Sequence, residues 1–324
     1  MRLRRFASLA KFVVSAVLII VLFERIPFTG VVQALRQVNP LLVAVAVLVF
    51  LVVNGLASFK WRLLLKAQGL AVTYLQALKV YFIGLFFNNF LPTGFGGDAM
   101  RVYRIARQTR RNTESAVSVG FDRVHSLWAL LIIAGPNCIL SAKALGIPIE
   151  LGFGIIACAF VAVIVAALLL SARVQSIVEE ISFHLPVRLG RGVFALLQPF
   201  RSLRSNINLL LWSTAVALTF QSLGFLVHYL LFASLRVSVD FSILVTVISL
   251  ATLGNALPLS INGIGVREGI YVVLLTRVGV TAPVAITLSI LSLAIHTFSS
   301  LLGGIFYAQG EGDGRRPSRL VQST

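Results

Sequence analysis

Six stretches of the chain are almost entirely apolar, and the polar residues gather in the segments between them. A helix needs about 20 mostly apolar residues to cross the hydrocarbon core of a bilayer. Backbone N–H and C=O groups find no water there, so each crossing segment is expected to be helical. The predicted full spans are residues 8–23, 41–59, 114–134, 151–170, 207–233 and 282–308.

Two further apolar stretches, residues 80–92 and 241–258, each end at a break rich in proline and glycine. The first has only about a dozen uncharged residues after Lys79, a length typical of re-entrant or interfacial segments. Both stretches can be re-entrant hairpins that return to their own side, or both can cross fully and give eight helices. The sequence therefore predicts an all-α, polytopic helical bundle with eight hydrophobic segments.

The composition excludes a soluble protein. Of 324 residues, 58% are hydrophobic and only 12% are charged, against about 25% charged in an ordinary soluble domain. Disorder is excluded by the same hydrophobic fraction. The chain is expected to form a single transmembrane domain over residues 1–308, with a disordered cytoplasmic tail at residues 309–324.

The net charge of +17 is explained by orientation rather than by nucleic acid. With a cytoplasmic N-terminus and two hairpins, 21 of the 28 basic residues fall on the cytoplasmic side, as the positive-inside rule requires. Lys60 and Arg101 are among those 21. Both termini are predicted to be cytoplasmic, and the basic N-terminus is interpreted as an uncleaved signal anchor. Charge favours hairpins, because a crossing at 80–92 would export the arginines of 101–111.

An internal repeat links the two breaks. Residues 89–101 and 255–267 both follow the pattern N-x-L-P-x4-G-x3-R, at an offset of 166 residues. Three predicted spans lie between the copies, so the second copy is expected to be inverted relative to the first. Interrupted helices at corresponding positions of inverted repeats mark the binding site in many transporters.

The chemistry of each break suits an anion. Proline ends a helix and frees backbone groups, glycine permits a sharp reversal, and a restarting helix directs its positive end at the break. The predicted broken-helix positions are Pro92, Gly94, Gly96, Gly97, Pro258, Gly263 and Gly265. The predicted substrate-binding residues are Asn89, Asn255, Arg101, Arg267, Asp98, Glu268, Asp122 and Arg123. The simpler alternative is that each break is a kink and each arginine an interfacial anchor.

Asp122 and Arg123 lie inside the predicted span 114–134, where ionisable residues are costly and need partners. Asp122 is expected to pair with Arg101 or Arg267, and Arg123 either contacts a lipid phosphate or extends to the interface. His125, His228 and His296 are interpreted as forming hydrogen bonds between helices. No catalytic constellation, nucleotide-binding loop or metal-ligand cluster is present in the sequence, so neither enzymatic activity nor a cofactor or metal is expected.

Three segments, NNFLPTGFGGDAMRVYR (88–104), GFDRV (120–124) and NALPLSINGIGVREGIYVVLL (255–275), resemble the lysylphosphatidylglycerol synthase transmembrane region family. The resemblance covers most of the chain and implies a flippase-like activity in the bacterial cytoplasmic membrane. The residues to which it assigns roles are Pro92, Gly97, Asp98, Arg101, Asp122, Arg123, Pro258, Gly263, Gly265, Arg267 and Glu268. The chain ends soon after its last span, so the soluble aminoacyl-transferase domain and lysyl transfer are not expected.

The leading hypothesis is a flippase or lipid-substrate transporter that moves an anionic, phosphate-bearing lipid or lipid-linked headgroup. Arg101 and Arg267 would hold that headgroup alternately from the two sides. The expected partners are membrane lipids and lipid-biosynthesis enzymes, without nucleic acid. Two alternatives stay open: a secondary transporter of a small anion, and a non-transporting membrane subunit of a lipid or glycolipid (for example hopanoid) biosynthetic complex.

Overall fold

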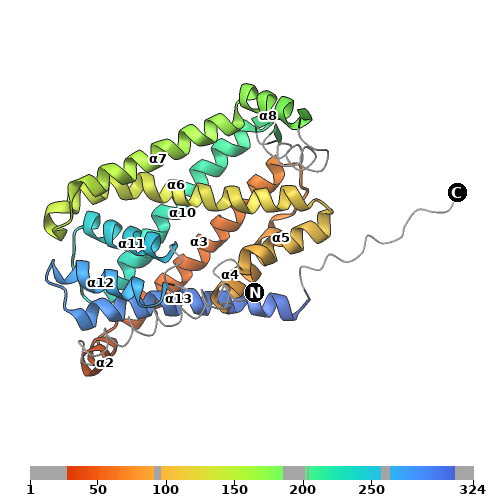
Figure 1. Cartoon of the computed structure of the whole chain (residues 1–324). Coiled ribbons are helices and arrows are strands. Elements are labelled where there is room, and N and C mark those ends of the chain that lie inside the picture. The colour runs from red at the N-terminus through yellow and green to blue at the C-terminus, as the bar shows by residue number, and fades with distance from the viewer. Residues whose placement is uncertain (1–27, 91–95, 185–200, 203, 257–262, 311–324) are drawn as a thin grey trace, which may run out of the picture.

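The computed structural model describes residues 28–90, 96–184, 201–202, 204–256 and 263–310, and these form eleven helices (Figure 1). No strand occurs among the described residues. The helices are α2 (Phe28–Arg36), α3 (Pro40–Ala67), α4 (Tyr74–Phe90), α5 (Gly96–Thr109), α6 (Asn112–Leu145), α7 (Ile149–Leu170), α8 (Ala172–His184), α10 (Ile207–Ser234), α11 (Phe241–Ala256), α12 (Val266–Thr276) and α13 (Ala282–Ala308).

Five helices within the described residues are long and apolar enough to cross a membrane: α3, α6, α7, α10 and α13. They match five of the six predicted spans, while the predicted span 8–23 and most of the predicted tail lie outside the described residues. The helix α11 is apolar but shorter. The prediction of an all-α membrane protein is therefore confirmed.

Two spans are longer than predicted. The helix α3 continues beyond residue 59 to Ala67, because Lys60 is buried against an ion-pair partner instead of ending the span at the membrane surface. The helix α6 continues through Pro136 to Leu145. Side-chain hydrogen bonds from Asn137 and Ser141 back to preceding carbonyls support this stretch, as polar side chains do around prolines in membrane helices.

The helices form two similarly arranged sets around the packed pair α3 and α10. In the first set α4 packs on α5 and α13, and in the second α11 packs on α12 and α6. The contact between α5 and α6 has its counterpart between α12 and α13. Figure 1 shows the α4–α5 pair and the α11–α12 pair at opposite ends of the bundle.

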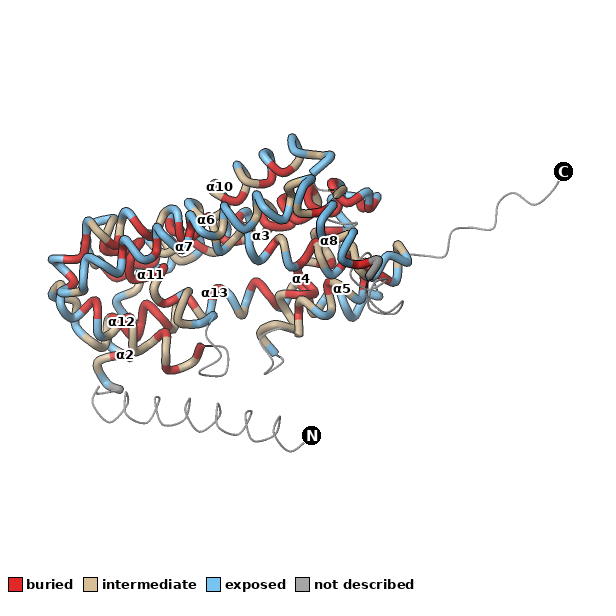
Figure 2. Tube along the Cα trace, turned by 45° about the horizontal axis from the view of Figure 1, so that its top comes forward, coloured by how far each residue is buried: buried red, intermediate tan, exposed pale blue. Residues whose placement is uncertain are grey.

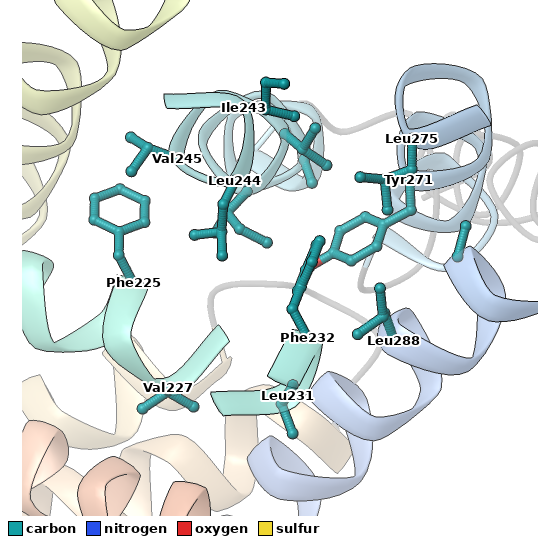
Figure 3. Packing of buried hydrophobic residues seen from close by; sticks show 14 of the residues in the cluster. Phe225, Val227, Leu231, Phe232, Ile243, Leu244, Val245, Tyr271, Leu275 and Leu288 are labelled. Carbon is teal, nitrogen blue, oxygen red and sulfur yellow. The ribbon is translucent and has the colours of Figure 1, made fainter. Parts of the chain in front are cut away.

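The largest apolar core lies in the second set. It joins Phe232 of α10, Leu244 of α11, Tyr271 of α12 and Leu288 of α13, which converge in Figure 3. Elsewhere large apolar side chains remain outside: Phe160 on α7 is 66% exposed, and Figure 2 shows exposed positions along the outer helices. A soluble monomer rarely exposes so much apolar surface, so these side chains are suited to contact lipid.

The contact between α4 and α13 depends on a glycine. A Cβ atom added at Gly303 would lie 1.9 Å from the carbonyl oxygen of Phe82, so no larger residue fits without separating the helices. We expect Gly303→Leu to lower the free energy of unfolding by about 1–3 kcal/mol, the usual cost of overpacking. Thermal unfolding in detergent measures this. Gly154→Ala on α7, where an added Cβ meets nothing within 4 Å, is the control, and equal melting temperatures would contradict the prediction.

Candidate functional site

The first break lies between Phe90, which ends α4, and Gly96, which begins α5. The backbone N–H of Gly97 donates to Oδ1 of Asn88 at 2.8 Å. A Cβ atom at Gly97 would lie 1.9 Å from the carbonyl oxygen of Gly84. Glycine is therefore required because the start of α5 lies directly against α4. Pro92 and Gly94 lie outside the described residues.

The second break follows the end of α11 at Ala256. Gly263 and Gly265 have φ angles of 71° and 88°, a region that glycine enters without steric cost. A Cβ atom at Gly263 would lie 1.9 Å from Oδ1 of Asn255. The N–H of Gly265 donates to Glu268 at 2.7 Å, which caps the start of α12. Pro258 lies outside the described residues.

Arg101 lies in a buried ion cluster. Its Nη2 atom is 2.7 Å from Oδ2 of Asp122, and Nζ of Lys60 is 2.9 Å from Oδ1 of the same carboxylate. All three residues are at most 5% exposed. The guanidinium also lies over the rings of Trp61 and Tyr81, 4.1 and 4.7 Å from their centroids. One carboxylate thus holds two cations from α3 and α5 against α6.

Asp98 extends this cluster towards the surface. Its Oδ1 atom is 3.5 Å from Nη1 of Arg101, and its Oδ2 atom accepts from Nε of Arg123 at 2.7 Å. The side chain of Arg123 is 51% exposed. Asp98 therefore connects the start of α5 to α6, and Arg123 has a carboxylate partner rather than only a lipid-facing role.

Arg267 has different neighbours. Its Nε atom donates to Oγ of Ser289 at 2.8 Å, and its Nη2 atom is 2.6 Å from Oε1 of Glu268. Ser289 in turn donates to the same Glu268 oxygen at 2.8 Å. The carboxylate therefore holds one edge of the guanidinium and fixes its direction. Arg267 is buried, with 8% of its surface exposed.

Arg267 lines a cavity of about 430 Å³ between α4, α10, α11, α12 and α13. It is the one Lys, Arg, Asp or Glu among the described residues that line this cavity. The other polar lining residues supply amide, hydroxyl and imidazole groups: Asn89, His228, Thr252, Asn255, Tyr271, Ser292, His296 and Thr297. The remaining described lining residues are apolar: Phe90, Ile248, Ala251, Ile264 and Leu293. A wall of this kind, in which Arg267 is the one cation among the described residues, is suited to hold an anion.

The cavity brings together three of the predicted binding residues, Asn89, Asn255 and Arg267. Both asparagines of the repeat thus lie at one site, although they are far apart in the sequence. Glu268 lies beside the site through its contact with Arg267. Arg101, Asp98, Asp122 and Arg123 form the separate ion cluster and are not among the described lining residues.

Several residues of both sites were not predicted from the sequence. Lys60 was assigned to a cytoplasmic loop, whereas it is 1% exposed and paired with Asp122. His228 and His296 were expected only to bridge helices, whereas both line the cavity. His228 also contacts Ser292, with 3.3 Å between Nε2 and Oγ. In the sequence, Lys60 directly follows the apolar run of residues 41–59, and this position could have indicated that it is buried. Asn88 lies next to the repeat residue Asn89, and this position could have indicated its part in the first break.

We expect Asp122→Asn to destabilise the fold by about 3–5 kcal/mol, because it leaves two buried cations without their carboxylate. The double variant Lys60→Met/Asp122→Asn should regain part of that loss, since one of the two cations is removed. Thermal unfolding in detergent measures both. Glu114→Gln, at a more exposed pair with Arg111, should change stability by only about 0–1 kcal/mol. A loss for Asp122→Asn no larger than that of Glu114→Gln would contradict the prediction.

Comparison with known proteins agrees with this architecture. The family model described as "Lysylphosphatidylglycerol synthase TM region" matches residues 8–304. A UPF0104 membrane protein from Methanothermobacter thermautotrophicus is 24% identical over 275 residues, which cover 78% of this chain and 80% of the relative. Another UPF0104 membrane protein, from Methanocaldococcus jannaschii, is 24% identical over 108 residues, 33% of this chain and 32% of the relative. The match spans most of the chain, including both breaks, the ion cluster and the cavity. The chain is therefore a multi-pass integral membrane protein that belongs to the lysylphosphatidylglycerol synthase TM region family.

Proposed function

We propose that the protein moves an anionic, phosphate-bearing lipid or lipid-linked headgroup between the leaflets of its membrane, and that Arg267 holds that headgroup. The observation that carries this proposal is that, among the described residues lining the cavity, Arg267 is the single arginine and the others are uncharged polar or apolar side chains. A buried cation in a membrane helix is costly unless it has a function or a partner. Glu268 and Ser289 hold one edge of Arg267, and an anion in the cavity would complete its coordination.

The depth of the cavity supports a transport site. Its lining residues on α13 are Ser292, Leu293, His296 and Thr297, at the middle of a 27-residue helix. Such a helix is about 40 Å long, so its centre is far from both ends. A headgroup bound there would lie close to halfway between the leaflets, where transporters of the inverted-repeat type bind their substrates.

The proposal includes an inverted repeat of two broken hairpins within a bundle of six full spans, the first of them at residues 8–23. The offset of 166 residues between the motifs supports it. So do the equal lengths of α3 and α10, 28 residues each, and the paired helix contacts of the two sets. The distribution of basic residues favours cytoplasmic termini. Because both relatives are archaeal, the bacterial cytoplasmic membrane stays a prediction from the resemblance.

In this mechanism the two asparagines contribute amide donors to the headgroup from opposite hairpins. Asn89 is the penultimate residue of α4 and Asn255 that of α11, and both line the cavity with Arg267. The α11–α12 hairpin, which carries Asn255 and Arg267, is then the element that moves when the cavity changes its exposed side. The driving force would be the substrate gradient or a coupled ion, and lipid-biosynthesis enzymes would supply the substrate.

We expect Arg267→Gln to slow headgroup translocation at least about tenfold, because a charge-assisted hydrogen bond contributes about 1.5–3 kcal/mol. Arg267→Lys should keep part of the translocation rate, because the positive charge stays but the bidentate hydrogen bonding of the guanidinium group is lost. The measurement is accessibility of a fluorescent phosphatidylglycerol analogue to an external quencher in reconstituted vesicles. Arg36→Gln, at an exposed position of α2, is the control.

Three outcomes would count against this function. Equal rates for the parent and Arg267→Gln would exclude Arg267 as the headgroup ligand. Uptake of radiolabelled phosphate that is independent of lipid composition would instead favour a secondary transporter of a small anion. Co-purification with a biosynthetic enzyme, with no translocation by the isolated protein, would favour a non-transporting subunit.

A further inference from the structure

The two halves of the molecule place different residues around equivalent arginines. Arg101 and Arg267 are 166 residues apart. The α6 residue that binds Arg101 is Asp122, and the α13 residue that binds Arg267 is Ser289, 167 positions later. The corresponding contact from the central helix pair also changes. Lys60 of α3 bonds Ser126, whereas His228 of α10 contacts Ser292.

The change from aspartate to serine alters what each arginine can still bind. In the first half, the Asp122 carboxylate takes Nη2 of Arg101, Asp98 approaches Nη1, and two aromatic rings lie against the guanidinium. In the second half, Ser289 and Glu268 take the Nε and Nη2 atoms of Arg267. Among the described residues, no acceptor is hydrogen-bonded to Nη1 of Arg267, and this arginine lines the cavity.

We propose that Asp122 and Asp98 act as internal counter-anions at the Nη2 and Nη1 atoms of Arg101, whereas at Arg267 Glu268 binds Nη2 and an external anion takes Nη1. The chain then has one anion site rather than two, and only its second half receives substrate. This inference rests on the proposed function, and it replaces the hypothesis that both arginines hold the headgroup alternately. The first half, held by Lys60, Arg101 and Asp122, serves as the fixed frame against which the cavity is built.

The electrostatics agree with this division. Asp122 is shared by two buried cations, so its movement away from Arg101 would leave that arginine with the more distant carboxylate of Asp98 as its counter-charge. Such a rearrangement would carry the large cost of breaking a buried ion pair. Ser289 is neutral and carries no such constraint. An external phosphate can therefore approach Arg267 without displacing a resident carboxylate from the cavity side.

The first test compares the same substitution at the two equivalent positions. Purified protein in detergent is titrated with inorganic phosphate at constant ionic strength, and the melting temperature is followed. Arg267→Gln should weaken the apparent affinity for phosphate about ten- to a hundredfold, the effect of a lost charged hydrogen bond. Arg101→Gln keeps the ion pair of Lys60 with Asp122 and should bind phosphate as the parent does.

The second test copies the residues of the second half onto the first. The variant Lys60→His/Asp122→Ser removes one cation together with the shared carboxylate, so the net charge of the cluster is unchanged with a neutral histidine. Introduced into Arg267→Gln, it should restore a phosphate-dependent rise in melting temperature. Adding Arg101→Gln should abolish that rise again, which assigns the restored site to Arg101.

The outcomes separate this inference from the proposed function. Equal loss of phosphate affinity in Arg101→Gln and Arg267→Gln would overturn the single-site inference and leave Arg267 as a headgroup ligand. Failure of the swapped variant to regain a response, although it folds, would also overturn it. If the parent itself shows no response to phosphate, the anion site at Arg267 is wrong, and the inference falls with it. The comparison of Arg101→Gln with Arg267→Gln does not depend on the swapped variant, so it tests the inference even if that variant does not fold.

Discussion

Every polar group at membrane depth needs a partner inside the protein, because lipid chains offer none. Asp122 meets this requirement for two cations together, and in doing so ties α3 and α5 to α6. At the two breaks, the backbone N–H groups of Gly97 and Gly265 at the starts of α5 and α12 are paired with the side chains of Asn88 and Glu268. The arrangement of both halves follows from pairing these few charged and backbone groups. The apolar helix surfaces do not specify it, because they can pack equally well against protein or lipid.

The same requirement separates the two arginines of the repeat. Arg101 receives its counter-charge from α6, and Arg267 receives only part of its coordination from Glu268 and Ser289. In the proposed mechanism the first copy of the motif therefore has a structural role, and the second copy holds the ligand. The difference comes from the residues that contact the two arginines, Asp122 of α6 at Arg101 and Ser289 of α13 at Arg267, rather than from the motif itself.

The positions of the long helices could be predicted closely from the sequence, because apolar length is a local property. Their ends could not always be predicted. The spans predicted to end at residues 59 and 134 continue through Lys60 and Pro136, which both lie inside helices. For Lys60 a tertiary contact, the carboxylate of Asp122 on α6, pairs the charge that would otherwise end the span. Around Pro136 the helix continues with hydrogen bonds from Asn137 and Ser141 to carbonyls of α6 itself.

By itself the sequence determined the fold class, the five spans within the described residues and the existence of two breaks, since hydrophobic length, proline and glycine act through neighbouring residues. It also placed Asn89, Asn255 and Arg267 among eight candidate binding residues. Only the tertiary structure decided that these three share a cavity, that Asp122 binds Arg101 and not Arg267, and that Lys60 and His228 take part. The reason is that ion pairing depends on which helices are neighbours, and residues 60, 101 and 122 meet only when α3, α5 and α6 pack together.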